Sequence, residues 1–453
     1  MESFAVFVFI MGYILIALEH PIKINKTPTA IITGVLCWTI VALSSPAAGL
    51  ADSHHYISFA DSLKNAASLG PTEIYQAFIH SELSIHLGQI ASILFFLMGA
   101  MTIVELVDAH HGFRFITDRI KTVDVRKLLW IICWVTFFLS AILDNLTTAI
   151  VMVSLTRKLV QDSKQRMFFA GMIIVAANAG GAWSPIGDVT TTMLWIGGQI
   201  SSTAIITSLF IPSIVCLVVP LIYLTFKLKG RLEPRITIGE DGEDHDYVKG
   251  GKTMLFVGVG ALVGVPIFKT VTHLPPYMGI LLGLGVLWVV SELINPHMDE
   301  FEKKRFSATT ALSRIDVPSV LFFMGILLAV GALETTQTLH RFAEYLSHVL
   351  GDNRIIITFI GMVSAIVDNV PLVAACMGMY SLETYPMDHM IWEYLAYCAG
   401  TGGSLLIIGS AAGVAVMGME KVDFIWYLKN ISFLALIGYL GGAAAYLFIH
   451  TMQ

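Results

Sequence analysis

The chain carries SAILDN at residues 140–145 and repeats it almost letter for letter as SAIVDN at residues 364–369. Each copy lies at the middle of a long apolar segment, residues 128–158 and residues 355–380. Each segment is about as long as two short helices, with an acidic and an amide side chain between them. A repeated Asp-Asn pair inside apolar surroundings indicates two hairpins with polar tips.

Composition indicates a membrane protein. Of the 453 residues, 56% are hydrophobic and 13% are charged, whereas soluble domains carry about 25% charged residues. The net charge of -6 comes without a basic cluster, which excludes a nucleic-acid partner. A membrane helix needs about 20 apolar residues. By that measure, spans are expected near residues 4–18, 28–45, 87–107, 166–200, 203–227, 252–271, 277–293, 316–333, 388–419 and 424–450.

The distribution of basic residues favours the hairpins. Lys and Arg in short loops collect on the cytoplasmic side of a membrane. If segments 128–158 and 355–380 enter and leave by the same face, 23 of the 27 basic residues fall on one side and 4 on the other. A full crossing at either segment would reverse every later loop. The pattern therefore predicts re-entrant hairpins and both termini outside the cytoplasm.

Glycine motifs extend the repeat. Gly180-Gly181 and Gly187 return with the same internal spacing as Gly402-Gly403 and Gly409. Since five spans precede the second half, that half is expected upside down, and broken helices at matching places mark the binding site of secondary transporters. We expect an all-α polytopic membrane protein of two inverted repeats with five spans each. Its parts are residues 1–232 (hairpin 128–158, broken helix 166–200), a cytoplasmic linker at 233–251, and residues 252–453 (hairpin 355–380, broken helix 388–419).

Oxygen-bearing side chains gather at the tips and breaks. A helix break frees backbone groups that are tolerated only beside protein or a water-filled cavity, and hard cations prefer oxygen ligands. The sequence therefore predicts a cation site at these places. The candidate ligands are Asp144, Asn145, Thr147, Asp188, Thr190, Thr191, Ser364, Asp368, Asn369, Thr401, Ser404 and Ser410. The two breaks differ at one matched position, because Asp188 stands where the second repeat has Ser410.

The acidic residues suggest how a proton enters the chemistry. Every Lys and Arg falls in a loop or at a span end, so none is expected beside the buried carboxylates, unless a loop residue such as Arg157 folds back. A desolvated carboxylate without a basic partner is neutralised by a proton or by a cation, and the two exclude each other. Cation/proton exchange follows, although a site where sodium helps to bind an anion stays open. The candidates for proton coupling are Glu105, Asp144, Asp188 and Asp368.

Together these motifs resemble the ion transporter superfamily and, within it, the NhaD-type sodium/proton antiporters. The resemblance is carried by SAILDNLTTA (140–149), NAGGAWSPIGDVTT (178–191), SAIVDNVP (364–371) and GTGGSLLIIGS (400–410). It implies sodium or lithium export in exchange for protons, a homodimer, an elevator-like movement and a bacterial inner membrane. It also implicates the tip and break residues named above, with Glu105 on the preceding span.

Two alternatives of the same fold remain, a sodium-coupled carboxylate symporter and an exporter of arsenite or another anion. Dicarboxylate symporters of the superfamily carry Ser-Asn-Thr at their tips, whereas this chain has Asp-Asn, whose fixed negative charge would repel an anion. An enzyme is not expected, since the chain has no HExxH motif. No cofactor is expected either; Na⁺ or Li⁺ and H⁺ are the transported ions, and the lipid bilayer is the partner.

Overall fold

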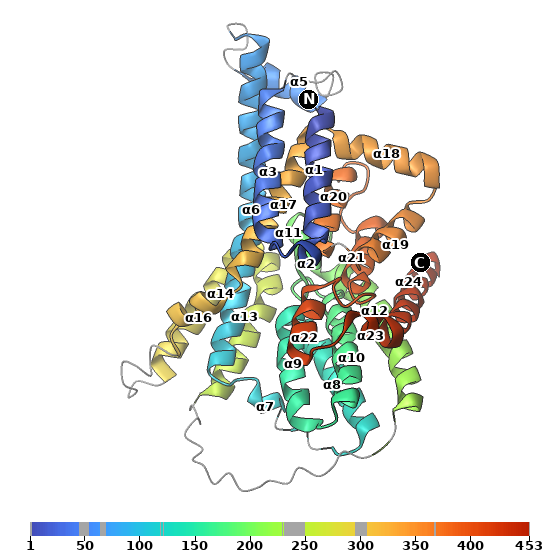
Figure 1. Cartoon of the computed structure of the whole chain (residues 1–453). Coiled ribbons are helices and arrows are strands. Elements are labelled where there is room, and N and C mark those ends of the chain that lie inside the picture. Colours follow the sequence, from blue (N-terminus) through green and yellow to red (C-terminus); the bar gives the residue numbers. More distant parts are fainter. Residues whose placement is uncertain are drawn as a thin grey trace. The chain divides into compact units, whose positions relative to one another are not determined.

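The computed structural model describes residues 2–44, 54–63, 69–117, 119–120, 122–228, 230, 250–294, 306–366 and 368–452. Regular structure in these ranges is helical (Figure 1), which confirms the predicted all-α class. The linker predicted at 233–251 lies outside the described residues up to position 249.

The chain is a multi-pass membrane protein. Within the described ranges, seven helices are long and apolar enough to cross a membrane, or eight if a pair bent by 114° counts as one span. They are Lys26–Leu43 (α3), Pro71–Ala109 (α6), Ser202–Lys227 (α12), Gly251–Thr272 (α13), Pro276–Ile294 (α14), Val317–Thr335 (α17) and the segment Phe424–Thr451.

Three predicted spans, 4–18, 166–200 and 388–419, are absent from that group. The first is the 16-residue helix α1 (Glu2–Ala17). The other two are each divided into two helices, because the chain leaves helical geometry after Gly181 and again after Gly402. The span expected at 87–107 is the second half of α6, whose 39 residues begin at Pro71.

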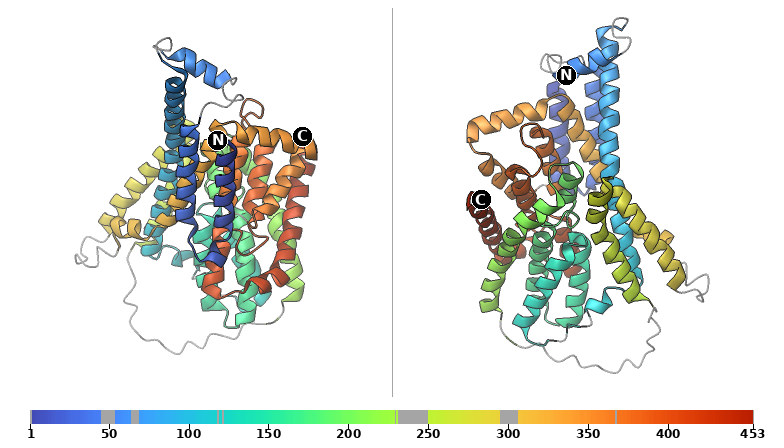
Figure 2. Two further views of the ribbon diagram at one scale, coloured as in Figure 1. Left: turned by 45° about the horizontal axis from the view of Figure 1, so that its top comes forward. Right: turned by 180° about the vertical axis from the view of Figure 1, so that it is seen from behind.

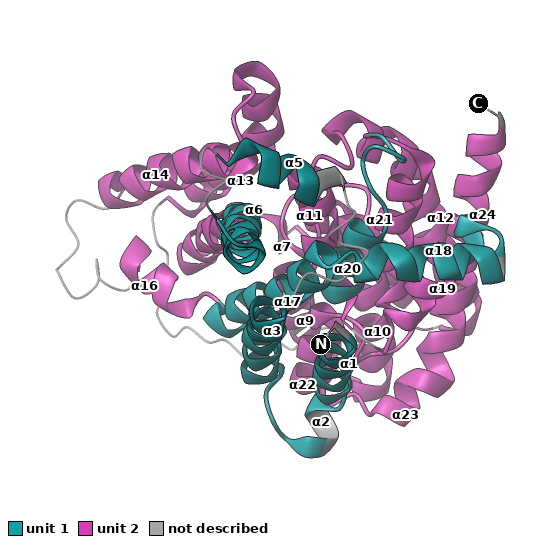
Figure 3. Ribbon diagram, turned by 90° about the horizontal axis from the view of Figure 1, so that it is seen from above, with its two compact units in different colours: residues 1–94, 316–356, 370–386 teal, residues 95–315, 357–369, 387–453 magenta. Residues whose placement is uncertain are grey.

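The chain divides into two compact units, which Figure 3 shows in different colours. The first comprises residues 1–94, 316–356 and 370–386. Its helices are α1, α2 (Glu19–Ile22), α3, α5 (His54–Ser62), the first part of α6, α17, α18 (Thr338–Leu350), the start of α19 (Asn353–Val363) and most of α20 (Asn369–Met379). Here α3 packs along α17, and the Trp38 indole Nε1 donates to the Leu328 carbonyl at 2.8 Å.

The second unit comprises residues 95–315, 357–369 and 387–453 and holds the predicted tips and breaks. Its helices are the rest of α6, α7 (Arg114–Thr117), α8 (Val125–Ser140), α9 (Asn145–Leu159), α10 (Ser163–Gly181), α11 (Val189–Ile196), α12, α13, α14, α16 (Ala308–Arg314), the rest of α19, α21 (Met390–Gly402), α22 (Ala411–Glu420), α23 (Phe424–Tyr427) and, after a π-helical turn at Leu428–Ser432, α24 (Phe433–Met452).

Helices α8, α9 and α10 lie side by side within this unit, as both views of Figure 2 show. Two glycines allow the break regions to approach the hairpins closely. A Cβ atom at Gly180 would collide with the Phe137 carbonyl of α8, and one at Gly402 would collide with the Gly361 carbonyl of α19. Only glycine fits such backbone-to-backbone contacts, so these positions allow each break region to pack against a helix of its own hairpin.

Candidate functional site

The first tip is formed where α8 ends at Ser140 and α9 begins at Asn145. Asp144 is the N-cap of α9: its carboxylate accepts from the Thr147 backbone N–H at 2.7 Å and from the Thr147 hydroxyl at 2.6 Å. Aspartate is a favoured N-cap because its oxygens satisfy amides that lack a helical partner. The Ser140 hydroxyl donates to the Ala177 carbonyl at 2.6 Å, which ties the tip to α10.

The first break presents a buried carboxylate. Asp188 precedes α11 in extended conformation, but its side chain makes no capping hydrogen bond to that helix. Instead the carboxylate accepts from the Asn145 amide at 3.2 Å, the Asn369 amide at 3.3 Å and the Thr190 hydroxyl at 2.6 Å. Asp188 is 3% exposed, and no Lys or Arg contacts it in the described part of the chain. Asparagines from both tips therefore meet at one acidic group.

The second break lacks this acidic group. Ser410 is the N-cap of α22, and its hydroxyl oxygen accepts from the Gly413 N–H at 3.2 Å. The same oxygen accepts from the Asn178 amide at 3.0 Å, and the neighbouring Ser404 oxygen accepts from it at 2.9 Å. The Ser410 hydroxyl therefore caps its own helix, whereas the Asp188 side chain makes no capping hydrogen bond.

Asn178 connects the two breaks, a role that the sequence analysis missed. It is fully buried near the end of α10, and its Oδ1 accepts from the Asn145 amide at 3.0 Å while its Nδ2 donates to Ser404 and Ser410. A buried amide is stabilised when its donors and acceptor are all used. The signal in the sequence was an asparagine within the apolar run AANAGG at 176–181.

The remaining predicted ligands are spread around this centre. Some of their hydroxyls bond to backbone carbonyls: Ser364 donates to Gly361 at 2.7 Å, Thr401 to Tyr397 at 2.6 Å, and Thr191 to Asp188 at 2.9 Å. Asp144 and Thr147 bond each other, and Asp368 directly precedes Asn369 at the second tip. The structure thus gathers Asn145, Thr190 and Asn369 directly around Asp188.

Glu105 corrects one expectation. It was expected to have no basic partner, but Arg314 at the end of α16 donates to its carboxylate at 3.4 Å. Both side chains are partly exposed. Such an exposed pair contributes at most about 1 kcal/mol, so Glu105 is set apart from the buried carboxylate at Asp188.

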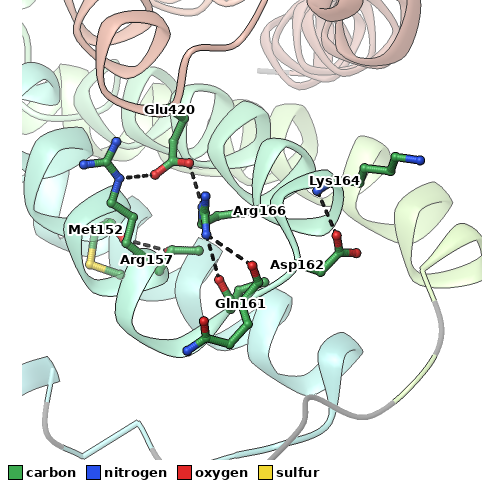
Figure 4. Close-up of polar contacts among 9 residues, drawn as sticks. Met152, Arg157, Gln161, Asp162, Lys164, Arg166 and Glu420 are labelled. Atoms are coloured by element: carbon green, nitrogen blue, oxygen red, sulfur yellow. Dashed lines mark hydrogen bonds and ion pairs between the residues drawn. The ribbon is translucent and has the colours of Figure 1, made fainter. Parts of the chain in front are cut away.

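Arg157 also has a partner, although not one of the tip aspartates. Its Nε donates to Glu420 Oε1 at 2.5 Å, and the Nε of Arg166 donates to Glu420 Oε2 at 2.7 Å (Figure 4). The Glu420 side chain is only 2% exposed. These three residues, which we call the ion triad, lie on α9, α10 and α22. Sequence reasoning allowed Arg157 to fold back but did not identify Glu420 or Arg166, because the arginines are 263 and 254 residues away from the glutamate.

The arrangement around Asp188 is suited to a small cation or a proton. A buried carboxylate is costly unless its charge is compensated. Here the compensation is three neutral donors, which stabilise the charge without neutralising it. Turning either amide over would bring a carbonyl oxygen to the same place, the ligand that a hard cation prefers.

Comparisons with known proteins extend over most of the chain. A family model for citrate transporters, CitMHS, matches residues 13–400. Sodium/proton antiporter 1 of Arabidopsis thaliana is 47% identical over 448 residues, which cover 98% of this chain and 72% of the plant protein. Sodium/proton antiporter 2 of the same plant is 43% identical over 446 residues, covering 97% and 98%. The Na⁺/H⁺ antiporter NhaD of Alkalimonas amylolytica is 28% identical over 474 residues, covering 98% and 90%.

Proposed function

We propose that the chain, which belongs to the citrate transporter family CitMHS and is homologous to NhaD antiporters, exchanges sodium ions for protons across a membrane. The family and the named relatives are transporters, so the chain is a transporter and not an enzyme. The resemblance inferred from the tip and break motifs is thereby confirmed.

The observation that carries the proposal is the surrounding of Asp188. Its carboxylate is buried, it receives only neutral donors, and two of those donors are the tip asparagines Asn145 and Asn369. A proton on this carboxylate and a sodium ion beside it neutralise the same charge and therefore exclude each other. A protein that opens such a site to each side of the membrane in turn exchanges one ion for the other.

The cation site that we propose is centred on Asp188, with oxygen ligands drawn from Asn145, Asn369 and Thr190. Ser404 and Ser410 are joined to this proposed site by the hydrogen bonds that they accept from Asn178. Asp144 and Asp368 at the two tips supply further negative charge, which attracts cations and disfavours anions. The transported ions are Na⁺ or Li⁺ and H⁺.

A second candidate function is citrate transport, because the matching family model carries that description. The charges in the second unit argue against it. A carboxylate substrate beside Asp188 would meet a fixed negative charge that no described basic residue contacts. Like charges in a water-poor site repel each other strongly. Sodium is therefore the substrate that the site favours.

Two finer proposals, a homodimer and an elevator-like movement of the tips and breaks, rest on the resemblance. The two inverted repeats that we propose rest on the matched motifs and the distribution of basic residues in the sequence. As the location we propose a bacterial inner membrane, in keeping with the bacterial source of the NhaD relative. Because two other relatives are plant proteins, membrane fractionation of the host cell is the experiment that tests this location.

Reconstituted vesicles test the function directly. The purified protein is placed in vesicles that contain a pH-sensitive dye, and sodium, lithium, potassium and citrate are added in turn. We expect proton movement on sodium and lithium addition and none on citrate. Proton movement that requires citrate would instead establish the carboxylate symporter, and an Asp188→Asn protein serves as the matched control for leak.

A further inference from the structure

Helices α9, α10 and α22 form a three-helix group within the second unit, since each packs against the other two. One end of the group lies at the proposed ion site. There Asn145 of α9 donates to Asn178 of α10, and Asn178 donates to Ser410, the N-cap of α22. All three helices are thus joined by hydrogen bonds at this end.

The ion triad joins the same three helices at their opposite ends. Each of its members lies about three helical turns from the ion-site residue of its own helix: Arg157 from Asn145 on α9, Arg166 from Asn178 on α10, and Glu420 from Ser410 at the start of α22. At about 1.5 Å rise per residue these separations are about 15–18 Å. The spacing along each helix is therefore matched, so one set of contacts constrains the other.

Glu420 is the central member of the triad. Each of its carboxylate oxygens accepts from one guanidinium, Oε1 from Arg157 and Oε2 from Arg166 (Figure 4). Arg166 also donates through Nη1 to the Val160 and Gln161 carbonyls, which fixes it to the end of α9. Charge-assisted hydrogen bonds of this kind are strong and directional. A shift of α22 along its axis would break both of them at once.

A matching contact lies at the start of α21. The alignment of the two halves that superposes their glycine motifs places Arg166 on Asp388. Asp388 accepts from the Ser201 N–H at 2.5 Å, and its own N–H donates to the Gln199 carbonyl at 2.9 Å, just after α11. The base of each interrupted helix is thus joined to the segment that ends the other one. In the second contact no arginine takes part, so of these two contacts only the triad depends on ion pairs.

We infer that Glu420 is a positioning residue for the ion site. It holds α22 in register with α9 and α10, and thereby holds Ser410 beside Asn178 and Asn145 beside Asp188. The inference rests on the proposed sodium/proton exchange at that site. Glu420 touches no transported ion. It affects the site only because it fixes the positions of α9, α10 and α22 relative to one another.

The test is the sodium dependence of exchange in vesicles. Glu420→Gln keeps the size of the side chain but removes its charge, so the register is loosened. We expect the sodium concentration for half-maximal exchange to rise about tenfold, which corresponds to about 1.4 kcal/mol of binding free energy, with a smaller change in the maximal rate. Glu420→Asp keeps the charge one methylene closer to the helix, and we expect an intermediate value. Glu344→Gln, in an exposed pair with His340, is the matched control and should behave as the wild type.

The outcomes separate this inference from the proposed function. Absence of sodium-driven proton movement in the wild type overturns the function itself. Normal exchange in the wild type, with an unchanged half-maximal sodium concentration in Glu420→Gln, overturns only the positioning role, even if the melting temperature falls. If Glu420→Gln does not fold, Arg157→Gln and Arg166→Gln decide, since each leaves one charge-assisted bond in place. Wild-type sodium dependence in both would contradict the inference.

Discussion

The two helix breaks use the same position for different purposes. Asp188 and Ser410 both precede a resuming helix in extended conformation, with φ near −144° and −143° respectively. Ser410 caps its helix, whereas the Asp188 carboxylate makes no capping hydrogen bond and accepts from the asparagines of both tips and from the Thr190 hydroxyl of α11. A residue type that caps well is therefore not used as a cap in the first break. This difference suggests that the charge at Asp188 serves the transported ions.

The largest effect is expected from Asp188→Asn. Asparagine caps a helix nearly as well as aspartate, and it keeps the size of the side chain, so the fold should persist. We expect sodium-driven proton movement to fall at least about a hundredfold, as when a preorganised electrostatic group is lost. The rate of sodium-driven proton movement is measured in vesicles that contain the pH-sensitive dye. Normal proton release in this variant would erase the distinction between the breaks and leave Asp188 as a structural residue.

A smaller but clear effect is expected at the first tip, which separates capping from charge. Asp144→Asn keeps a good N-cap for α9 and removes the charge, so we expect exchange to fall about tenfold in a protein of wild-type stability. Asp144→Ala loses both the cap and the charge, so we expect its free energy of unfolding to be lower by about 1 kcal/mol as well. Exchange rates and thermal melts of the two variants give the comparison. Equal exchange in Asp144→Asn and the wild type would show that Asp144 serves only as the N-cap of α9.

The smallest effect is expected from Ser410→Ala, which changes the neutral break. The variant loses the cap of α22 and one acceptor for Asn178, and we expect about 0.5–2 kcal/mol less stability. Exchange should remain measurable, with the half-maximal sodium concentration raised about threefold. Sodium titrations of dye-loaded vesicles provide the measurement. Complete loss of proton coupling here would show that the second break is as important as the first and would end the asymmetry.

Several features could be predicted from local residue patterns. Long apolar runs predicted α3, α12, α13, α14 and α17, because burial of a helix in lipid depends on composition over about 20 residues. The polar pairs at 144–145 and 368–369 marked the turns before α9 and α20, where aspartate and asparagine favour helix starts. Interrupted helices are harder to assign as spans, because each half is too short to be recognised by length.

Contacts between distant helices could not be predicted in this way. The sequence analysis treated Glu105 as unpartnered and left the partner of Arg157 open, yet Arg314 and Glu420 meet them from 209 and 263 residues away. It also named Asn145, Asn369 and Asp188 as candidate ligands without showing that the asparagines of both tips reach the one carboxylate. A long, flexible arginine can satisfy a carboxylate on any neighbouring helix, so its partner is decided by how the helices pack.

The sequence by itself determined that the protein is helical, lies in a membrane and carries acidic and amide groups at two related positions. These properties depend on hydrophobicity and local propensity, which act over one helix length. Tertiary structure alone decided that Asn178 joins the two breaks and that the Asp188 side chain, unlike that of Ser410, makes no capping hydrogen bond. It also decided that Glu420 connects the far ends of α9, α10 and α22 through its two ion pairs. Hydrogen bonds and ion pairs act over about 3 Å, so they form only after folding has brought distant segments that close.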